Sequence, residues 1–227
     1  MRNREGWEVK KIGEFLEQIR GVSYKPSDLG QEETDSFIPL LRANNIQNEL
    51  VFEDLNFVHI SKVKDVQLIK EGDILVCTSS GSKHLVGKAA QASRDLNMTF
   101  GAFCKIIRPK NINSDFLGFY FKSNIYRQKI SEFSRGANIN NIKTEHIDSL
   151  QIPIPPRDIQ HQIVSELDTL NYIIDKKKEQ LNELDNLAQA TFYDMFGDPV
   201  ENEKGWEVKK LGDTVSLING RAYKRDE

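Results

Sequence analysis

The sequence has little of what stabilises secreted or membrane proteins. Only two cysteines, Cys77 and Cys104, occur in 227 residues, and neither has a second cysteine or a histidine at the spacing of a metal site. No apolar run approaches the roughly 18 residues of a membrane span, and the first residues lack the apolar core of a secretory signal. These absences predict a reduced, soluble, cytoplasmic protein with no disulfide framework, no bound metal and no membrane association.

Signatures of catalysis are missing too. The chain has no G-x-S-x-G nucleophile elbow, no phosphate-binding glycine loop and no H-E-x-x-H metal motif. The Asn/Asp-Pro-Pro-aromatic motif of adenine methyltransferases is absent, because "IPIPPRD" has the prolines without the polar and aromatic flanks. The four histidines share no spacing. The sequence therefore favours a non-catalytic protein without a cofactor of its own; an enzyme with a dispersed active site is the alternative.

Charge is distributed unevenly along the chain. The net charge is −3, yet residues 75–143 contain 11 Lys/Arg against 3 Asp/Glu. The flanking segments are acidic, with 10 Lys/Arg against 14 Asp/Glu in residues 1–74 and 4 against 9 in residues 156–198. A basic block inside an acidic chain can form one positive face, which suits a phosphate backbone. The alternative is that these charges scatter over the surface of a domain.

The opening of the chain returns near its end. "GWEVKKIGEF" from residue 6 reappears as "GWEVKKLGDT" from residue 205, and 11 of the 20 positions that begin at Gly6 match at an offset of 199. This period is far longer than the units of about 20–50 residues that build solenoids. It indicates a duplicated unit, of which this chain holds one full copy and the start of a second.

Residues 1–155 predict a mixed α+β domain. Short strand-like runs are separated by turn residues. These runs are "SFIPLLRANNI", "LVFEDLNFVHI", "GDILVCTSSGS", "GKAAQA", "FGAFCKIIRP" and "SLQIPIP". A single helix is expected over residues 114–134, capped by Ser114 or Asp115. Its expected apolar face consists of Phe116, Phe119, Tyr120, Tyr126 and Ile130.

Residues 156–197 predict one long helix with a coiled-coil seam. The 40 residues from 157 to 196 contain no Gly and no Pro, which corresponds to a helix of roughly 60 Å. Apolar residues recur at alternating steps of four and three, the pattern of a helix that pairs with another helix. The seam is Ile163, Leu167, Leu170, Ile174, Lys177, Leu181, Leu184 and Ala188, with Lys177 as its one polar member. Gly197 and Pro199 are expected to end the helix.

Three polar stretches and the repeated opening carry the side chains expected to bind DNA. Hydroxyl groups and backbone amides suit phosphates, while Arg and Asn suit guanine and adenine edges. The candidates are Tyr24, Lys25, Arg42, Asn44, Asn45, Thr78, Ser79, Ser80, Ser82, Lys83, His84, Lys88, Arg135, Asn138, Asn140, Asn141 and Lys143. The alternative is that these stretches are solvated turns whose side chains satisfy their own backbone.

The order of these motifs resembles the DNA-specificity subunit of type I restriction–modification systems. The resemblance covers nearly the whole chain. It rests on "GWEVKKIGEF" with "RGVSYK", on "IPLLRANNI", on "EGDILVCTSSGS" and on "GANINNIKTEHIDSLQIPIPPRDIQHQIVSELD". The last of these, which leads into the long helix, is the most specific.

The resemblance implies a division of labour. Members of this family carry two target-recognition domains, each followed by a long helix; the helices pack antiparallel as a spacer, and each domain reads one half of a split target in double-stranded DNA. Residues 1–155 would be one such domain, residues 156–197 its spacer helix, and residues 198–227 a linker and the truncated start of a second domain. The implied partners are methylation subunits that bind S-adenosylmethionine and a restriction subunit driven by ATP.

Length is the departure from the family, because only the opening of a second domain is present. The unpaired seam is therefore expected to pair with a second copy, giving a homodimer that mimics an intact subunit. A coiled-coil scaffold that does not bind DNA is the other reading of the helix.

Overall fold

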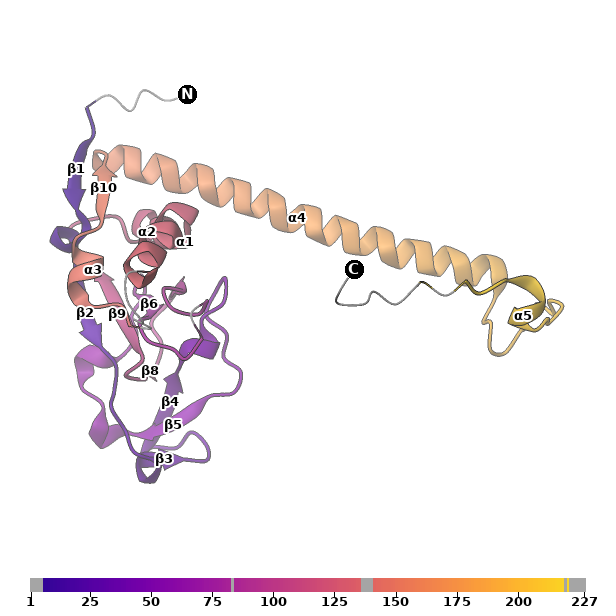
Figure 1. The fold of residues 1–227 in the computed structure, drawn as a ribbon, viewed down its shortest axis with the longest axis horizontal. Coiled ribbons are helices and arrows are strands. Elements are labelled where there is room, and N and C mark those ends of the chain that lie inside the picture. The colour runs from indigo at the N-terminus through magenta and orange to yellow at the C-terminus, as the bar shows by residue number, and fades with distance from the viewer. Residues whose placement is uncertain (1–5, 83, 136–140, 219, 221–227) are drawn as a thin grey trace, which may run out of the picture. The chain divides into compact units, whose positions relative to one another are not determined.

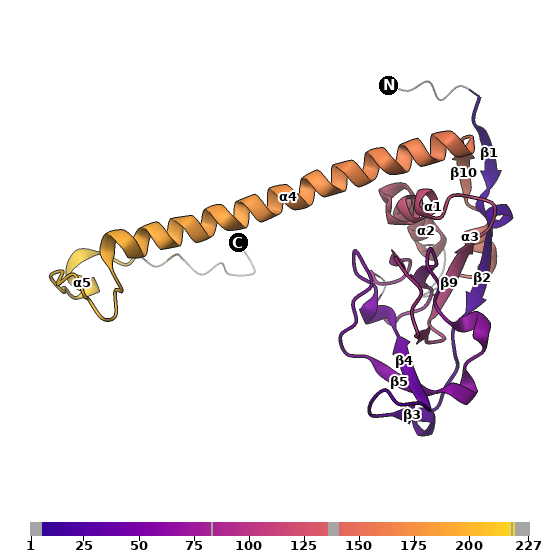
Figure 2. The ribbon, with the colours of Figure 1, turned by 180° about the vertical axis from the view of Figure 1, so that it is seen from behind.

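The fold is mixed α+β, as the sequence predicts (Figures 1 and 2). The computed structural model describes residues 6–82, 84–135, 141–218 and 220, with only the backbone of 134 and 135. The chain divides into two compact units, Met1–Thr169 and Leu170–Glu227. The strands are β1 (Glu8–Lys11), β2 (Leu16–Arg20), β3 (Leu29–Gly30), β4 (Phe37–Leu41), β5 (Asn56–His59), β6 (Ile74–Cys77), β7 (Ala89–Gln91), β8 (Thr99–Phe100), β9 (Cys104–Pro109) and β10 (Gln151–Ile154). The helices are α1 (Ser114–Lys122), α2 (Asn124–Arg135), α3 (Thr144–Asp148), α4 (Arg157–Phe196) and α5 (Leu211–Thr214).

Three sheets build the first unit. One has the order β2-β9-β6-β7, the second β3-β5-β4-β8, and the third consists of β1 and β10. Strands β4 and β8 run parallel, and the other pairs are antiparallel. All six predicted strand-like runs contain a strand, whereas β1, β2 and β3 lie outside those runs.

Strand β6 is buried on both faces, which explains its unbroken apolar sequence. Ile74 and Val76 point into a core shared with α1, α2 and α3. Leu75 and Cys77 point the opposite way, into a core that contains Leu41 of β4. The first sheet is therefore a middle layer, with helices on one face and the second sheet on the other.

The predicted single helix over residues 114–134 is wrong, because the chain breaks at Ser123. The backbone of Ser123 is extended, with φ −74° and ψ 151°. Its hydroxyl donates to the carbonyl of Tyr120 (2.7 Å) and accepts the N–H of Tyr126 (3.2 Å), which ends α1 and begins α2. The α1 cap is also corrected: it is Asn113, whose Oδ1 accepts the N–H of Phe116 at 2.8 Å.

The break changes which residues face the core. Tyr126 and Ile130 of α2 are fully buried, as predicted. In α1 the fully buried residues are instead Leu117 and Phe121, whereas Phe119, predicted on the apolar face, is partly exposed.

Helix α4 has the predicted bounds, and Gly197 ends it. Gly197 has φ +74°, a left-handed conformation that suits glycine, and its N–H donates to the carbonyl of Tyr193 at 2.8 Å. The seam residues Leu181 and Leu184 of the second unit are 63% and 60% exposed. Across the part of the chain that the structure describes, no helix is both long and apolar enough to cross a bilayer.

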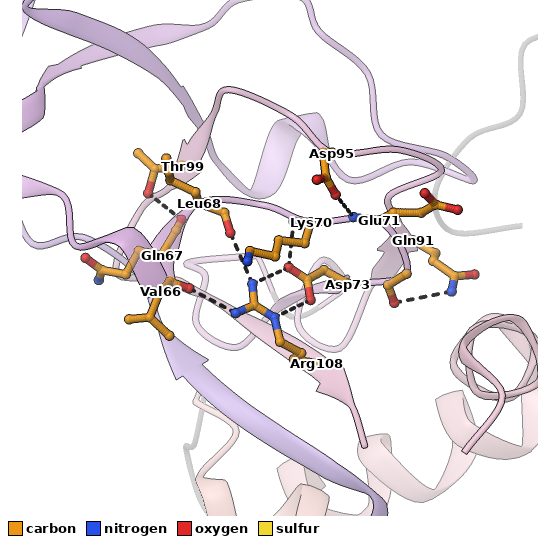
Figure 3. A network of polar contacts seen from close by, with 11 residues as sticks. Val66, Gln67, Leu68, Lys70, Glu71, Asp73, Gln91, Asp95, Thr99 and Arg108 are labelled. Carbon is orange, nitrogen blue, oxygen red and sulfur yellow. Dashed lines mark hydrogen bonds and ion pairs between the residues drawn. The ribbon is translucent and has the colours of Figure 1, made fainter. Parts of the chain in front are cut away.

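A buried ion pair fastens a loop to the first sheet (Figure 3). Arg108 of β9 donates from Nε and Nη2 to the two carboxylate oxygens of Asp73, at 2.8 and 2.7 Å. Its Nη2 also donates to the carbonyl of Leu68 (3.1 Å), and Asp73 accepts the N–H of Lys70 (2.8 Å). One guanidinium thus fixes the chain that leads into β6.

Replacing Arg108 is expected to destabilise the first unit. The Asp73 side chain is only 1% exposed, so Arg108→Met leaves a buried carboxylate without its cation, at a cost of about 3 kcal/mol. Urea unfolding of the full chain measures the loss. Arg94→Met, at an exposed position of the neighbouring loop, is the control. An equal loss of unfolding free energy in both variants would contradict a stabilising role for the Arg108–Asp73 ion pair.

Candidate nucleic-acid interface

Two adjoining hollows open on the first unit, and Ser23 and Ala102 belong to the walls of both. We call the hollow of about 640 Å³ groove 1 and that of about 510 Å³ groove 2. Groove 1 is lined by Val22, Ser23, Tyr24, Arg42, Ala43, Asn44, Ser79, Ser80, Gly81, Gly101, Ala102, Phe103 and Cys104. Groove 2 is lined by Arg20, Gly21, Ser23, Thr78, Ala102, Lys105, Asn141, Ile142, Lys143, Thr144 and Glu145.

The turn between β8 and β9 holds two of the predicted loops together. The carbonyl of Phe103 accepts the backbone N–H groups of Thr78 (2.9 Å) and Ser79 (3.0 Å), and also the Thr78 hydroxyl (3.1 Å). Ile142 donates its N–H to the carbonyl of Thr78 at 2.7 Å, and Ser79 forms an isolated bridge with Asn141. Residues from the loop after β6 and the loop before α3 therefore share one edge.

The same turn anchors the segments after β2 and β4. The N–H of Gly101 donates to the carbonyl of Leu41 at 2.9 Å, and Val22 donates to the carbonyl of Phe100 at 2.8 Å. The chain at Gly21 comes so close that a Cβ there would lie 2.1 Å from the carbonyl oxygen of Gly101. Only glycine allows this approach, and Gly21 is one of the residues that recur in the repeat, as Gly220.

Eight of the predicted DNA-binding residues line these grooves. Groove 1 contains Tyr24, Arg42, Asn44, Ser79 and Ser80, and groove 2 contains Thr78, Asn141 and Lys143. Arg42 donates from Nη2 to the carbonyl of Asp54 at 2.6 Å, which holds its side chain. Its buried Nε has no hydrogen-bond partner among the described residues. Groove 1 is therefore lined by an arginine whose side chain is held by the loop that follows it.

Apart from Asn45, the other predicted residues fall into two groups. Lys25, Ser82, His84 and Lys88 are described but line neither groove. Lys83, Asn138, Asn140 and the side chain of Arg135 lie outside the described part of the chain.

Asn45 is corrected, because its side chain is used inside the domain. It is completely buried. Its Oδ1 accepts the N–H of Arg42 at 2.8 Å, and its Nδ2 donates to the carbonyls of Val51 (3.0 Å) and Glu53 (2.7 Å). Both amide donors are occupied, so the structure gives the Asn45 side chain the role of shaping the loop that presents Arg42.

Sequence reasoning missed Phe103 and the basic wall of groove 2. Phe103 is 70% exposed at the tip of the β8–β9 turn. Arg20 and Lys105 face each other on β2 and β9, and Lys105 is only 8% exposed. The sequence does contain a signal for Lys105. This charged residue stands between Cys104 and Ile106, at a strand position where buried residues are usually apolar.

Two glycine substitutions test the close approach that shapes the grooves. Gly21→Ala forces the β2 segment away from the backbone of Gly101, and we expect a loss of about 2 kcal/mol in stability. Gly101→Ala is the matched control, because its Cβ would meet Leu40 at an ordinary 3.5 Å. Thermal unfolding of both variants checks this; equal melting temperatures would contradict the account.

Residues 4–186 match the family described as type I restriction modification DNA specificity domain. The chain is 40% identical over 201 residues to the type I restriction enzyme EcoKI specificity subunit of Escherichia coli (strain K12), covering 88% of this chain and 43% of that protein. It is 41% identical over 187 residues to the StySPI specificity subunit of Salmonella potsdam, covering 82% and 40%.

Solved structures share the fold. The HsdS subunit from Thermoanaerobacter tengcongensis has a TM-score of 0.60 and 20% identity, over 86% of this chain and 45% of that chain. A chain from a study of complex assembly and conformational transition of the type I R-M system has a TM-score of 0.61 and 22% identity, over 82% and 44%. This chain thus spans less than half the length of these relatives.

Proposed function

Since the chain belongs to the family of type I restriction–modification DNA specificity domains, we propose that its first unit reads a DNA sequence. The observation that carries the proposal is that predicted polar residues from separate loops line two adjoining grooves. A surface of this kind matches the mixture of base-edge and phosphate contacts that sequence recognition requires.

Within the grooves, the side chains divide by chemistry. Arg42 and Asn44 of groove 1 present groups that pair with guanine and adenine in the major groove. Ser79, Ser80 and Lys143 suit phosphates, which fix the register without reading sequence. One such domain reads one half of a split target, and the other half requires a second domain.

Catalysis belongs to other subunits in this proposal. The relatives are named as specificity subunits of restriction enzymes, and this chain would direct methylation and restriction subunits to their site. S-adenosylmethionine and ATP would bind those partners, and the present chain would need no cofactor. Because its target would be cellular DNA, we propose that the complex acts in the cytoplasm.

The α4 seam is proposed to pair with a second copy of this chain. Leu170, Ile174, Leu181 and Leu184 are each more than half exposed, and an apolar stripe of this spacing is stabilised by an antiparallel helix. Two copies related by a twofold axis would set two reading domains at a fixed separation, as the spacer of an intact subunit does.

Selection of duplexes from a random-sequence library tests the reading function. The full chain is expected to enrich a short motif, and Asn44→Ala is expected to relax one position of it by about tenfold. Asn48→Ala is the control, at an exposed position of the same segment outside both grooves. Enrichment of no motif by the wild-type chain would contradict the proposal.

Light scattering tests the pairing of the helix. The wild-type chain is expected to be a dimer at micromolar concentration. Leu181→Glu places a charge in the seam and is expected to raise the dimer dissociation constant at least tenfold, about 1.4 kcal/mol. Asn186→Glu, at an exposed position away from the seam, is expected to leave the dimer intact. A wild-type monomer would rule out this mode of assembly.

A further inference from the structure

Lys105 is a nearly buried charge in the wall of groove 2. Lys105 lies on β9 opposite Arg20 of β2, and the residue is only 8% exposed. Its ammonium donates to Oε1 of Gln18 at 3.1 Å and to the hydroxyl of Thr144 at 2.8 Å. An ammonium has three N–H donors, so one remains without an acceptor among the described residues.

Both groups that accept from Lys105 are neutral. No described carboxylate forms an ion pair with it. The nearby Asp148 is engaged by Gln18, whose Nε2 donates to Oδ1 of Asp148 at 2.7 Å. Burial, and then the charge of Arg20, lower the pKa of Lys105, while Glu145 and Asp148 act in the opposite direction. The fold therefore keeps a cation in a poorly solvated place without a direct countercharge.

Groove 2 around this lysine is basic. Arg20, Lys105 and Lys143 line it, against the single carboxylate of Glu145. A buried charge without a partner costs free energy. An anion that enters the groove supplies the missing acceptor and the missing countercharge together, which offsets that cost.

We propose that groove 2 seats a phosphodiester of the DNA backbone and that Lys105 is its anchoring residue. This rests on the proposed function and deepens it: groove 2 fixes the DNA backbone, and Arg42 and Asn44 of the adjoining groove 1 then face the bases. Because a phosphate contact carries no sequence information, the assignment applies to any duplex and can be tested without knowing the target.

The test is the salt dependence of binding to a random-sequence duplex, followed by fluorescence anisotropy of the full chain. Each phosphate contact contributes about 0.9 to the slope of log K against log salt. Lys105→Met is expected to lower the slope by that amount and to weaken binding about tenfold at low salt. Lys110→Met removes the same charge from an exposed lysine that pairs with Glu17 at 2.9 Å, and is expected to keep the wild-type slope.

Two further variants separate binding from a purely structural role. Thr144→Val removes a partner of Lys105 but keeps the charge, so the slope is expected to stay. Lys143→Gln alters the exposed wall of the groove without touching the core, and is expected to lower the slope by about 0.9 even if Lys105→Met unfolds the chain. A wild-type slope in Lys143→Gln, or in a folded Lys105→Met, would overturn the proposal that groove 2 binds a phosphodiester.

The experiment distinguishes a failure of phosphodiester binding in groove 2 from a failure of the proposed function. If the wild-type chain binds no duplex at low salt, the reading function itself fails. If the wild type binds with a steep salt slope and both Lys105→Met and Lys143→Gln share that slope, only the assignment of groove 2 fails.

Discussion

The turn of residues 101–104 is the backbone constraint on which the candidate interface depends. Its Phe103 carbonyl accepts three hydrogen bonds from Thr78 and Ser79, and its Gly101 N–H binds the end of β4. Segments after β2, β4 and β6 therefore meet at one turn, and the segment at residues 141–142 joins them through Thr78 and Ser79. The backbone groups beneath the grooves satisfy one another's hydrogen bonds, as buried backbone groups must. A substitution that moves the backbone of this turn would consequently alter the shape of both grooves.

A second set of contacts joins the sheets of the first unit to the start of α4. Strand β1 pairs with β10, so the first and last strands of the domain lie together (Figure 1). Just beyond β10, Gln160 of α4 accepts the N–H of Asn113 at 2.9 Å and donates to the carbonyl of Pro155 at 2.9 Å. Asn113 also caps α1. The first turn of the helix is thus held by hydrogen bonds within the first unit.

The elements that the sequence predicted correctly are those with a clear local pattern of apolar and breaker residues. The runs around β4, β6 and β9, the bounds of α4 and the glycine at its end all follow from local patterns. The break at Ser123 did not, because a serine at that position is compatible with helix until its hydroxyl bonds to the flanking backbone. The convergence of the loops depends on long-range hydrogen bonds to the 101–104 turn, which no local pattern reports.

Residue type alone misled at Asn45 and did not identify Lys105. An asparagine in a polar loop suggests a base contact, yet the Nδ2 of Asn45 donates to two carbonyls of its own loop. Lys105 has a place in the wall of groove 2, with neutral partners, that only the tertiary structure shows. In both cases the role is set by tertiary contacts, which is why site residues are harder to predict than strands.

Hydrogen–deuterium exchange of the full chain, with and without duplex DNA, tests the central claim most directly. If the loops form one DNA-binding surface, peptides that cover residues 20–24, 41–45, 78–82, 101–105 and 141–145 should all gain protection together. Peptides from residues 49–52 and 91–96, which line a separate hollow, should not change. Protection of that separate hollow, or of one loop alone, would contradict a common surface built around the 101–104 turn.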